Sequence, residues 1–284
     1  AVTALALAAL LSLAPAVFSG AVQQAGWEWL PELGLNLNFR LDGLGLLFGL
    51  LITGIGLLVI LYACYYLSER DDPGRFYSFL LLFMGAMLGI VLADNLLLLL
   101  MFWELTSLGS FLLIGYWHPR TDARRGARLA LTVTAGGGLA LLGGFLLLGH
   151  IVGSFELSVV LAAGDTVKQH PDYLAILLLI VLGVFTKSAQ FPLHFWLPQA
   201  MAAPTPVSAY LHSATMVKAG VFLLARLFPV LADTDPWFFL VGGVGLLTLL
   251  FAAYAALFQH DIKGLLAYST VSHLGLITLL FGLG

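Results

Sequence analysis

The feature that most constrains this chain is a series of long apolar runs separated by short polar breaks. An α-helix needs about 20 residues to cross the roughly 30 Å hydrocarbon core of a bilayer, and several runs reach that length. Hydrophobic residues make up 61% of the 284 positions and charged residues only 10%, unlike the composition of a soluble domain. Membrane spans are expected near 1–20, 43–67, 76–93, 96–116, 127–149, 173–201, 205–228, 237–258 and 262–283.

Because a backbone in lipid must satisfy its own hydrogen bonds, these runs are predicted to be helices. We therefore expect an all-α fold, a polytopic transmembrane helix bundle of about nine spans that forms a single membrane domain over 1–284. An outer-membrane barrel would need short alternating strands, and we interpret the sequence as lacking them. A short amphipathic helix on the outer surface is expected within 153–168.

The two ends of the sequence indicate a piece of a longer protein. The chain begins at Ala1 without methionine and ends at Gly284 inside an apolar run. Residues 1–20 also permit a signal peptide, but they lack the basic n-region that such a peptide carries. A spanning helix is the preferred interpretation, and the signal peptide stays open as an alternative.

The basic residues predict which side of the membrane each loop faces. Loops on one side hold only Arg40 and Lys168, with Arg226 near the end of a span, and most of the acidic residues. Loops on the other side carry the larger basic set, which consists of Arg70, Arg75, Arg120, Arg124, Arg125, Arg128 and Lys263. The positive-inside rule places this larger set, and with it the amino end of the chain, in the cytoplasm.

Glu104 is a charge in an unexpected place. It lies well inside the expected span 96–116, and no neighbour in the sequence neutralises it. A charged side chain near the bilayer centre costs about 2.5–3.5 kcal/mol on insertion scales, so it persists where it has a partner, water or a task. Its partner is expected on another helix. The structural alternative is a protonated glutamic acid that only holds two helices together.

Lys187 lies near the middle of the expected span 173–201, shortly before Pro192. A proline removes a helical hydrogen bond, so this helix is expected to break just after the lysine, with Pro198 as a second breaker. A broken helix in lipid survives only beside a cavity or a binding site. A lysine buried there can both hold and release a proton. The alternative is a lysine that extends to the interface.

His212 and Lys218 follow in the next span. Pro204 and Pro206 suit the first turn of its helix, which places the histidine and then the lysine progressively deeper. Histidine titrates near neutral pH and is a natural relay between two lysines. Alone, His212 would be typical of a hydrogen-bonded core histidine, but its place between Lys187 and Lys218 along the chain favours a relay.

A weaker set of polar residues surrounds the last span. Asp261 is expected to cap its helix. Lys263 either joins the proton path or anchors at the headgroups, and His273 is the better relay candidate. Asp94 is expected to be a turn residue that faces water, and His194 is left open between function and packing.

We recognise none of the sequence motifs of several common kinds of binding site and active site. Cys64 is the only cysteine, so the chain offers no disulfide, thiolate metal site or iron–sulfur cluster. We recognise no P-loop, dinucleotide fingerprint, metal-spaced histidine pair or Ser/His/Asp pattern. The net charge of −3 does not favour nucleic acid. We therefore expect no cofactor, no bound metal and no enzymatic activity, with energy coming from an ion gradient or a partner.

The motifs around these residues resemble a known family, the antiporter-like subunits shared by Mrp-type Na⁺/H⁺ antiporters and the respiratory NADH:quinone oxidoreductase. The similarity runs from about Arg40 to the end of the chain, and the Tyr210-Leu211-His212-Ser213 segment resembles the large A subunit of the Mrp complex most closely. The matching segments are FWEL at 102–105, TKSAQFP at 186–192, WLP at 196–198, PTPVSA at 204–209, HSATMV at 212–217, DIK at 261–263 and AYST at 267–270.

The resemblance implies a half-channel for protons, with the core transporter module at about 76–284. It also implies a multi-pass subunit in a bacterial inner membrane, surrounded by lipid and by other membrane subunits of the same complex. One departure matters. The respiratory relative carries an acidic residue where Gly138 stands here, within Gly136-Gly137-Gly138. An ion pair on that helix is therefore not expected.

The resulting hypothesis is antiport of protons against a monovalent cation, for which we expect Na⁺. Glu104 would stabilise protonated Lys187, and a change in that pairing would release the proton. The residues of the expected path, in order, are Glu104, Lys187, His212, Lys218, Lys263 and His273. Two alternatives stay open. One is a proton-pumping subunit of a NADH:quinone oxidoreductase or hydrogenase-type complex, and the other is a structural membrane scaffold.

Overall fold

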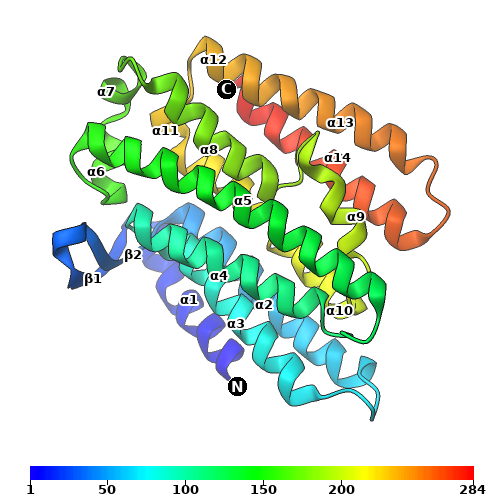
Figure 1. The fold of residues 1–284 in the computed structure, drawn as a ribbon. Coiled ribbons are helices and arrows are strands. Elements are labelled where there is room, and N and C mark those ends of the chain that lie inside the picture. Colours follow the sequence, from blue (N-terminus) through cyan, green and yellow to red (C-terminus); the bar gives the residue numbers. More distant parts are fainter.

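The computed structural model describes the backbone of residues 1–284 and all side chains except that of Ser213. Helices dominate the chain and run side by side, with the two chain ends at opposite edges of the bundle (Figure 1). Within this described part, six helical segments are long and apolar enough to cross a membrane. They are α2 (Gly43–Tyr66), α3 (Pro73–Leu92), α4 (Leu96–Ile114), α5 (Thr121–Val152), the segment Asp235–Ala256 and α14 (Ile262–Leu283).

The other three expected spans correspond to shorter helices. Two of these, α1 (Val2–Phe18) and α8 (Tyr173–Lys187), are apolar but shorter than a full crossing. The expected span 205–228 is divided into α10 (Thr205–Ser208), the π-helix η3 (Ala209–Ala214) and α11 (Lys218–Leu231). The count of nine spans therefore stays a prediction. The segment Asp235–Ala256 itself consists of α12 (Asp235–Trp237), the π-helix η4 (Phe238–Gly242) and α13 (Gly243–Ala256).

Helix α8 ends at Lys187, and regular helix resumes only at η2 (Leu193–Phe195) and α9 (Trp196–Ala200). Between them Ala189 has a φ of 49°, and the Phe191–Pro192 peptide is cis. Pro192 has no N–H to donate to the carbonyl of Ser188. That carbonyl accepts a 3.0 Å hydrogen bond from the side chain of Gln190 instead. The chain thus leaves the helix before it reaches the proline, and the proline as the cause of the break stays a prediction.

The expectation of a purely helical chain is wrong in one region. Residues 23–41 form an antiparallel hairpin of β1 (Gln23–Leu30) and β2 (Leu35–Leu41). The short helix η1 (Pro31–Leu33) connects the strands, and Gly34 closes the connection with a φ of 66°, which glycine adopts without strain. Strand β2 alternates apolar and polar residues, the pattern of a strand with one covered face.

The connection after α5 also differs in detail from the single amphipathic helix expected at 153–168. It contains two short helices, α6 (Leu157–Ala162) and α7 (Gly164–Lys168). Leu157 and Val167 are buried against the ends of the longer helices. Helix α5 itself begins earlier than the expected 127, because Thr121–Val152 is one continuous helix.

Glycines bring α5 and α8 into close contact near the middle of the bundle. A Cβ on Gly137 would overlap the side chain of Thr186, and a Cβ on Gly183 would overlap Leu141 and the carbonyl of Gly137. Such small residues let helix backbones approach closely where lipid supplies little driving force for association. This contact fixes the end of α8, from which the Lys187 side chain reaches α4.

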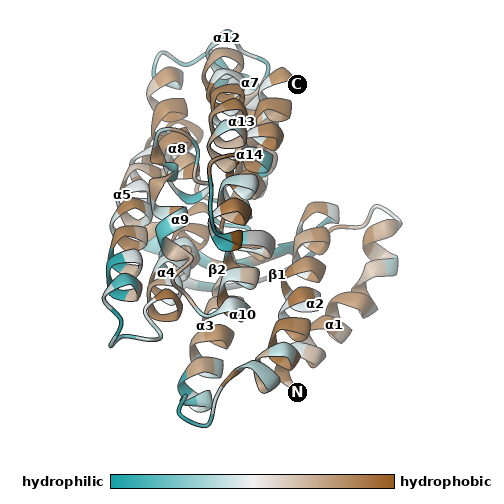
Figure 2. Ribbon diagram, turned by 90° about the vertical axis from the view of Figure 1, so that its right-hand side faces the viewer, coloured by the Kyte–Doolittle hydropathy of each residue, from teal (hydrophilic) through white to brown (hydrophobic). Residues whose placement is uncertain are grey.

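The outer surface of the bundle is apolar. Figure 2 shows hydrophobic residues along the helices and hydrophilic residues at their ends and in the loops. Leu58, Leu139 and Leu250 are 64%, 72% and 60% exposed. Leucines pointing outward from long helices fit a hydrocarbon surround, because lipid tails are as apolar as they are.

Candidate functional site

Lys187 is the only lysine in the described chain that is fully buried, with 0% of its surface exposed. It is the last residue of α8, and its side chain reaches α4. The Nζ atom donates to the carbonyl of Trp103 at 3.1 Å and to the hydroxyl of Ser107 at 2.8 Å. It also lies 5.3 Å from the centre of the Trp103 ring. All of these are neutral partners.

Glu104 follows Trp103 on α4 and lies close enough to Lys187 for an electrostatic interaction. The expected pairing is nevertheless not a direct salt bridge, since no ion pair joins the two residues in the described chain. One carboxylate oxygen of Glu104 is buried without a hydrogen-bond partner among those residues. The same oxygen rests against Gly138 of α5, where a Cβ would overlap it.

His212 lies in η3 and is 1% exposed. Neither ring nitrogen makes a well-aligned hydrogen bond within the described part of the chain, although the backbone of Ala200 lies close to the ring. Its ring centre is 6.2 Å from that of Trp196, whose indole N–H donates to the carbonyl of Thr186 at 2.9 Å. His212 therefore faces the same interrupted region that follows Lys187.

Lys218 begins α11 and is partly buried. Its backbone N–H donates to the carbonyl of Thr215 at 3.0 Å, so the chain turns there from η3 into α11. The structure thus places Lys187, His212 and Lys218 at the interrupted parts of two neighbouring segments. Along the chain they run from the end of α8 through η3 to the start of α11.

The two remaining candidates lie on α14. Asp261 caps this helix as predicted, accepting from the N–H of Gly264 at 2.7 Å. Lys263 donates to the carbonyls of Met201 and Ala203 at 3.2 and 3.0 Å, rather than extending away from the bundle. His273 is exposed, and its Nδ1 lies 2.7 Å from the carbonyl of Ser269 in its own helix. It does not face His212 or Lys218 directly.

Comparisons with known families decide where this arrangement belongs. Residues 93–284 match the model of the NADH:quinone oxidoreductase/Mrp antiporter transmembrane family. The chain belongs to this family. Residues 27–77 also match the model of the NADH-ubiquinone oxidoreductase (complex I) chain 5 N-terminus. The chain is accordingly a polytopic integral membrane protein.

Named relatives are similar over almost the whole chain. The probable K⁺/H⁺ antiporter A/B subunit of Rhizobium meliloti is 62% identical over 272 residues, covering 96% of this chain and 27% of the relative. The Na⁺/H⁺ antiporter A subunit of Alkalihalophilus pseudofirmus is 54% identical over 267 residues, covering 94% and 33%. The chain therefore spans about a third or less of the length of these relatives.

Two solved structures share the fold. A chain of the Mrp complex from Dietzia superposes with a TM-score of 0.90 at 40% identity, covering 98% of this chain and 31% of that one. A chain of the membrane-bound sulfane sulfur reductase, an archaeal respiratory membrane complex, superposes with a TM-score of 0.87 at 26% identity, covering 99% and 57%.

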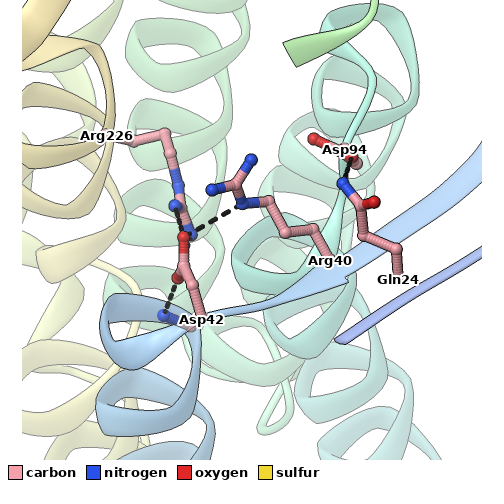
Figure 3. A network of polar contacts seen from close by, with 6 residues as sticks. Gln24, Arg40, Asp42, Asp94 and Arg226 are labelled. Carbon is pink, nitrogen blue, oxygen red and sulfur yellow. Dashed lines mark hydrogen bonds and ion pairs between the residues drawn. The ribbon is translucent and has the colours of Figure 1, made fainter. Parts of the chain in front are cut away.

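This Mrp-family chain contains a second charged cluster that the sequence did not indicate. Figure 3 shows Arg226 of α11 pointing at Asp42, where strand β2 meets α2. The guanidinium donates to both carboxylate oxygens of Asp42, at 3.0 Å for Nη2 to Oδ1. Arg40 adds a hydrogen bond of 3.1 Å to Oδ2, and the carboxylate also caps α2 through Gly45. The Arg226 side chain is 5% exposed.

The surroundings of Asp42 explain its charge state. Burial alone would raise the pKa of this carboxyl, but the hydrogen bonds from Arg226, from the Gly45 N–H and from Arg40 outweigh burial and lower the pKa to about 2. Asp42 is therefore ionised at any physiological pH. The sequence offered one signal for it, an aspartate directly before the glycine that opens a helix.

Asp94 does not face water as expected. It is 5% exposed, and Oδ2 accepts a 3.1 Å hydrogen bond from Gln24 of the hairpin (Figure 3). Burial raises the pKa of Asp94, and the nearby Glu156 adds to the shift while Arg40 opposes it. Asp94 is buried because the hairpin, which was not predicted, covers it. No group of three or more His, Cys, Asp or Glu side chains in the described residues could hold a metal ion.

Proposed function

We propose that this chain carries part of the proton path of a proton/monovalent-cation antiporter, as one membrane subunit of a multi-subunit Mrp-type complex. The observation that carries the proposal is Lys187, a fully buried amine whose hydrogen-bond partners are neutral oxygens. A buried charge without a charged partner is costly. Such a lysine can therefore change its protonation state when its surroundings change only slightly.

Glu104 supplies the change in surroundings. Its charge stabilises protonated Lys187 through space, without the direct contact that would fix the lysine as a cation. Movement or protonation of Glu104 removes that support, and the lysine then releases its proton. The unpartnered carboxylate oxygen of Glu104 fits a group that alternates between two arrangements.

The proton then passes from Lys187 through His212 to Lys218. His212 is a suitable carrier because both of its ring nitrogens are free of well-aligned hydrogen bonds within the described residues, so either can accept or donate. The interrupted segments beside it supply backbone carbonyls, which water can bridge. Lys263 and His273 continue the proton path. Because His273 is exposed on the surface of the bundle, the proton would pass from it to a neighbouring part of the complex.

The finer assignments belong to the same proposal. Transported ions are H⁺ and Na⁺, the chain binds no cofactor of its own, and it is a transporter rather than an enzyme. It lies in a bacterial plasma membrane with about nine spans, of which the segment near 173–201 is broken at Pro192, whereas Pro198, the second predicted breaker, lies inside α9. Its neighbours are lipid and other membrane subunits, and the core transporter module is 76–284.

A redox-driven proton pump is the second candidate, and the likeness to a chain of an archaeal respiratory complex favours it. The same buried lysine would then be driven by electron transfer in other chains. Absorbance spectra of the purified complex distinguish the two. Flavin or iron–sulfur absorbance would identify the redox-driven complex, and its absence together with cation-dependent proton flux would identify the antiporter.

The direct test is Lys187→Ala in the complete complex, assayed in everted membrane vesicles. We expect Na⁺-dependent proton flux to be abolished while the complex still assembles. Lys168→Ala is the matched control, since this lysine lies outside the path and contacts Asp233 at 3.5 Å. Glu104→Ala should also abolish flux, and Glu104→Asp should keep part of it. Full flux in Lys187→Ala would contradict the proposal, and lost assembly would support the scaffold instead.

A further inference from the structure

A cavity of about 440 Å³ lies between α3, α4 and α5, at the end of the bundle that carries most of the arginines. The apolar part of its lining includes Phe79, Phe111 and Leu112. Its rim is basic, with Arg75 from α3 and Arg124 and Arg128 from α5. The proposed proton path does not use it.

The three rim arginines lack acidic partners within salt-bridge distance in the described chain. Arg75 donates to the carbonyl of Tyr116 at 3.0 Å, and its Nε is buried without a partner among the same residues. Arg124 donates to the carbonyl of His118 at 2.7 Å, and Arg128 to that of Arg124 at 3.3 Å. The cavity rim therefore carries three positive charges, none of which forms an ion pair with a carboxylate of the described residues.

Acidic residues do lie nearby, but each is engaged elsewhere. Asp72 caps α3 by accepting from the backbone N–H of Arg75. Asp71 accepts from the indole of Trp117 at 2.9 Å, and Asp122 pairs with Arg120 at 2.6 Å. Hydrogen bonds from Trp117 and Ser68, together with the nearby charge of Arg75, outweigh burial and lower the pKa of Asp71, so it stays ionised. Asp71 therefore offsets part of the Arg75 charge through space, and Arg124 and Arg128 stay available to an external anion.

The depth of the rim matches the headgroup region of a membrane. Helix α5 has 32 residues, so it is about 48 Å long and exceeds the roughly 30 Å hydrocarbon core. Arg124 and Arg128 lie within its first eight residues, four residues apart and on the same face. The aromatic side chains of Phe79 and Phe111 lie about one turn deeper on α3 and α4. The positive charges thus lie at headgroup depth and the apolar side chains lie deeper, which matches the phosphate and acyl chains of a phospholipid.

We infer that this cavity binds an anionic phospholipid of the cytoplasmic leaflet, with the phosphate at Arg75, Arg124 and Arg128 and an acyl chain against Phe79, Phe111 and Leu112. Basic pockets between transmembrane helices on the cytoplasmic side are suited to acidic headgroups. A free phosphate or a nucleotide would leave the apolar wall without a partner. A lipid without net negative charge would place its own cationic group beside the arginines and leave their charge uncompensated.

The test uses the complete complex, delipidated in detergent and titrated with phosphatidylglycerol or phosphatidylcholine, with bound lipids counted by native mass spectrometry. We expect one phosphatidylglycerol site that Arg124→Gln/Arg128→Gln weakens about 30-fold, from about 1 kcal/mol for each arginine near an anionic surface. Arg70→Gln/Arg125→Gln is the matched control, because it also removes two positive charges, from exposed positions outside the cavity. Equal weakening in this control would overturn the inference.

Leu112→Trp provides a test that keeps every charge. It fills the apolar wall, and we expect it to displace phosphatidylglycerol while the complex stays assembled. Inorganic phosphate at millimolar concentration should compete poorly with the lipid. Effective competition by phosphate together with unchanged lipid binding in Leu112→Trp would identify a soluble-anion site instead. A photo-crosslinker at position 112 that captures another subunit rather than lipid would also overturn the assignment.

Discussion

Two buried basic residues of this chain, Lys187 and Arg226, differ in the charge of their hydrogen-bond partners. Arg226 is 6% exposed and meets Asp42 through two hydrogen bonds from its guanidinium, with Arg40 bound to the same carboxylate. Lys187 is 0% exposed and meets a carbonyl and a hydroxyl. One charge is fixed by a partner of opposite sign. The other is held in place while its charge is left free to change.

The difference follows the architecture of the chain. Arg226 ties α11 to the start of α2 and to the hairpin, elements that lie far apart in sequence. An ion pair with good geometry and further hydrogen bonds suits that fixed role, because breaking it leaves an uncompensated charge. Lys187 stands at an interrupted helix, where polar backbone and water give a proton somewhere to go. The paired charge holds the helices, and the unpaired one has the freedom that our proposal for proton transport requires.

Asp42→Ala should have the largest effect on stability. It leaves Arg226 and Arg40 without their shared carboxylate and removes the cap of α2. We expect a loss of about 3–5 kcal/mol, the range found when one partner of a buried ion pair is removed. Thermal unfolding of the purified complex measures it. The control is Asp122→Ala, which breaks a pair that is half exposed, at 53% and 54%, and should leave the unfolding temperature almost unchanged because solvent screens such pairs.

Acid should remove the same stabilisation in the wild type. Because the folded-state pKa of Asp42 is lowered from 3.8 to about 2, its contribution is complete above pH 3.8 and is lost as the pH falls through about 2. The advantage of the wild type over Asp42→Ala should therefore be constant from pH 6 to 9 and shrink only in strong acid. A difference that varied around neutral pH would show that Asp42 is not the fixed partner.

Most of the helical frame could be predicted because lipid leaves a long apolar run few alternatives to a helix. Sequence also indicated Glu104 and Lys187, since charges in such runs are rare. The hairpin was missed although Leu35-Asn36-Leu37-Asn38-Phe39-Arg40-Leu41 alternates strictly, because the apolar runs around it dominated the interpretation. Asp94 was then misjudged, since the hairpin buries it, and the partner of Arg226, Asp42 directly after β2, was not anticipated. Partners far apart in sequence cannot be read from local pattern.

Gly138→Ala should have the next largest effect, and it tests whether Glu104 needs its present position. The added Cβ would overlap the Glu104 carboxylate, so the side chain or α5 must shift, at about 1–3 kcal/mol for an overpacked site. We expect both the proton flux and the free energy of unfolding of Gly138→Ala to fall. Gly136→Ala is the control on the same helix, because a Cβ there meets nothing within 4 Å. Unchanged flux in Gly138→Ala would mean that the position of Glu104 does not matter for transport.

Lys187→Met should have the smallest effect on stability, and it separates the two cations most sharply. The two oxygens that lose the lysine keep other hydrogen bonds. The carbonyl of Trp103 accepts from the hydroxyl of Thr106 at 2.7 Å, and the hydroxyl of Ser107 donates to the same carbonyl at 3.4 Å. Methionine fills a similar volume without a charge, so unfolding should change by about 1 kcal/mol or less. Proton flux should nevertheless be lost. A cost as large as that of Asp42→Ala would show that Lys187 is a structural cation after all, and the contrast with Arg226 would then fail.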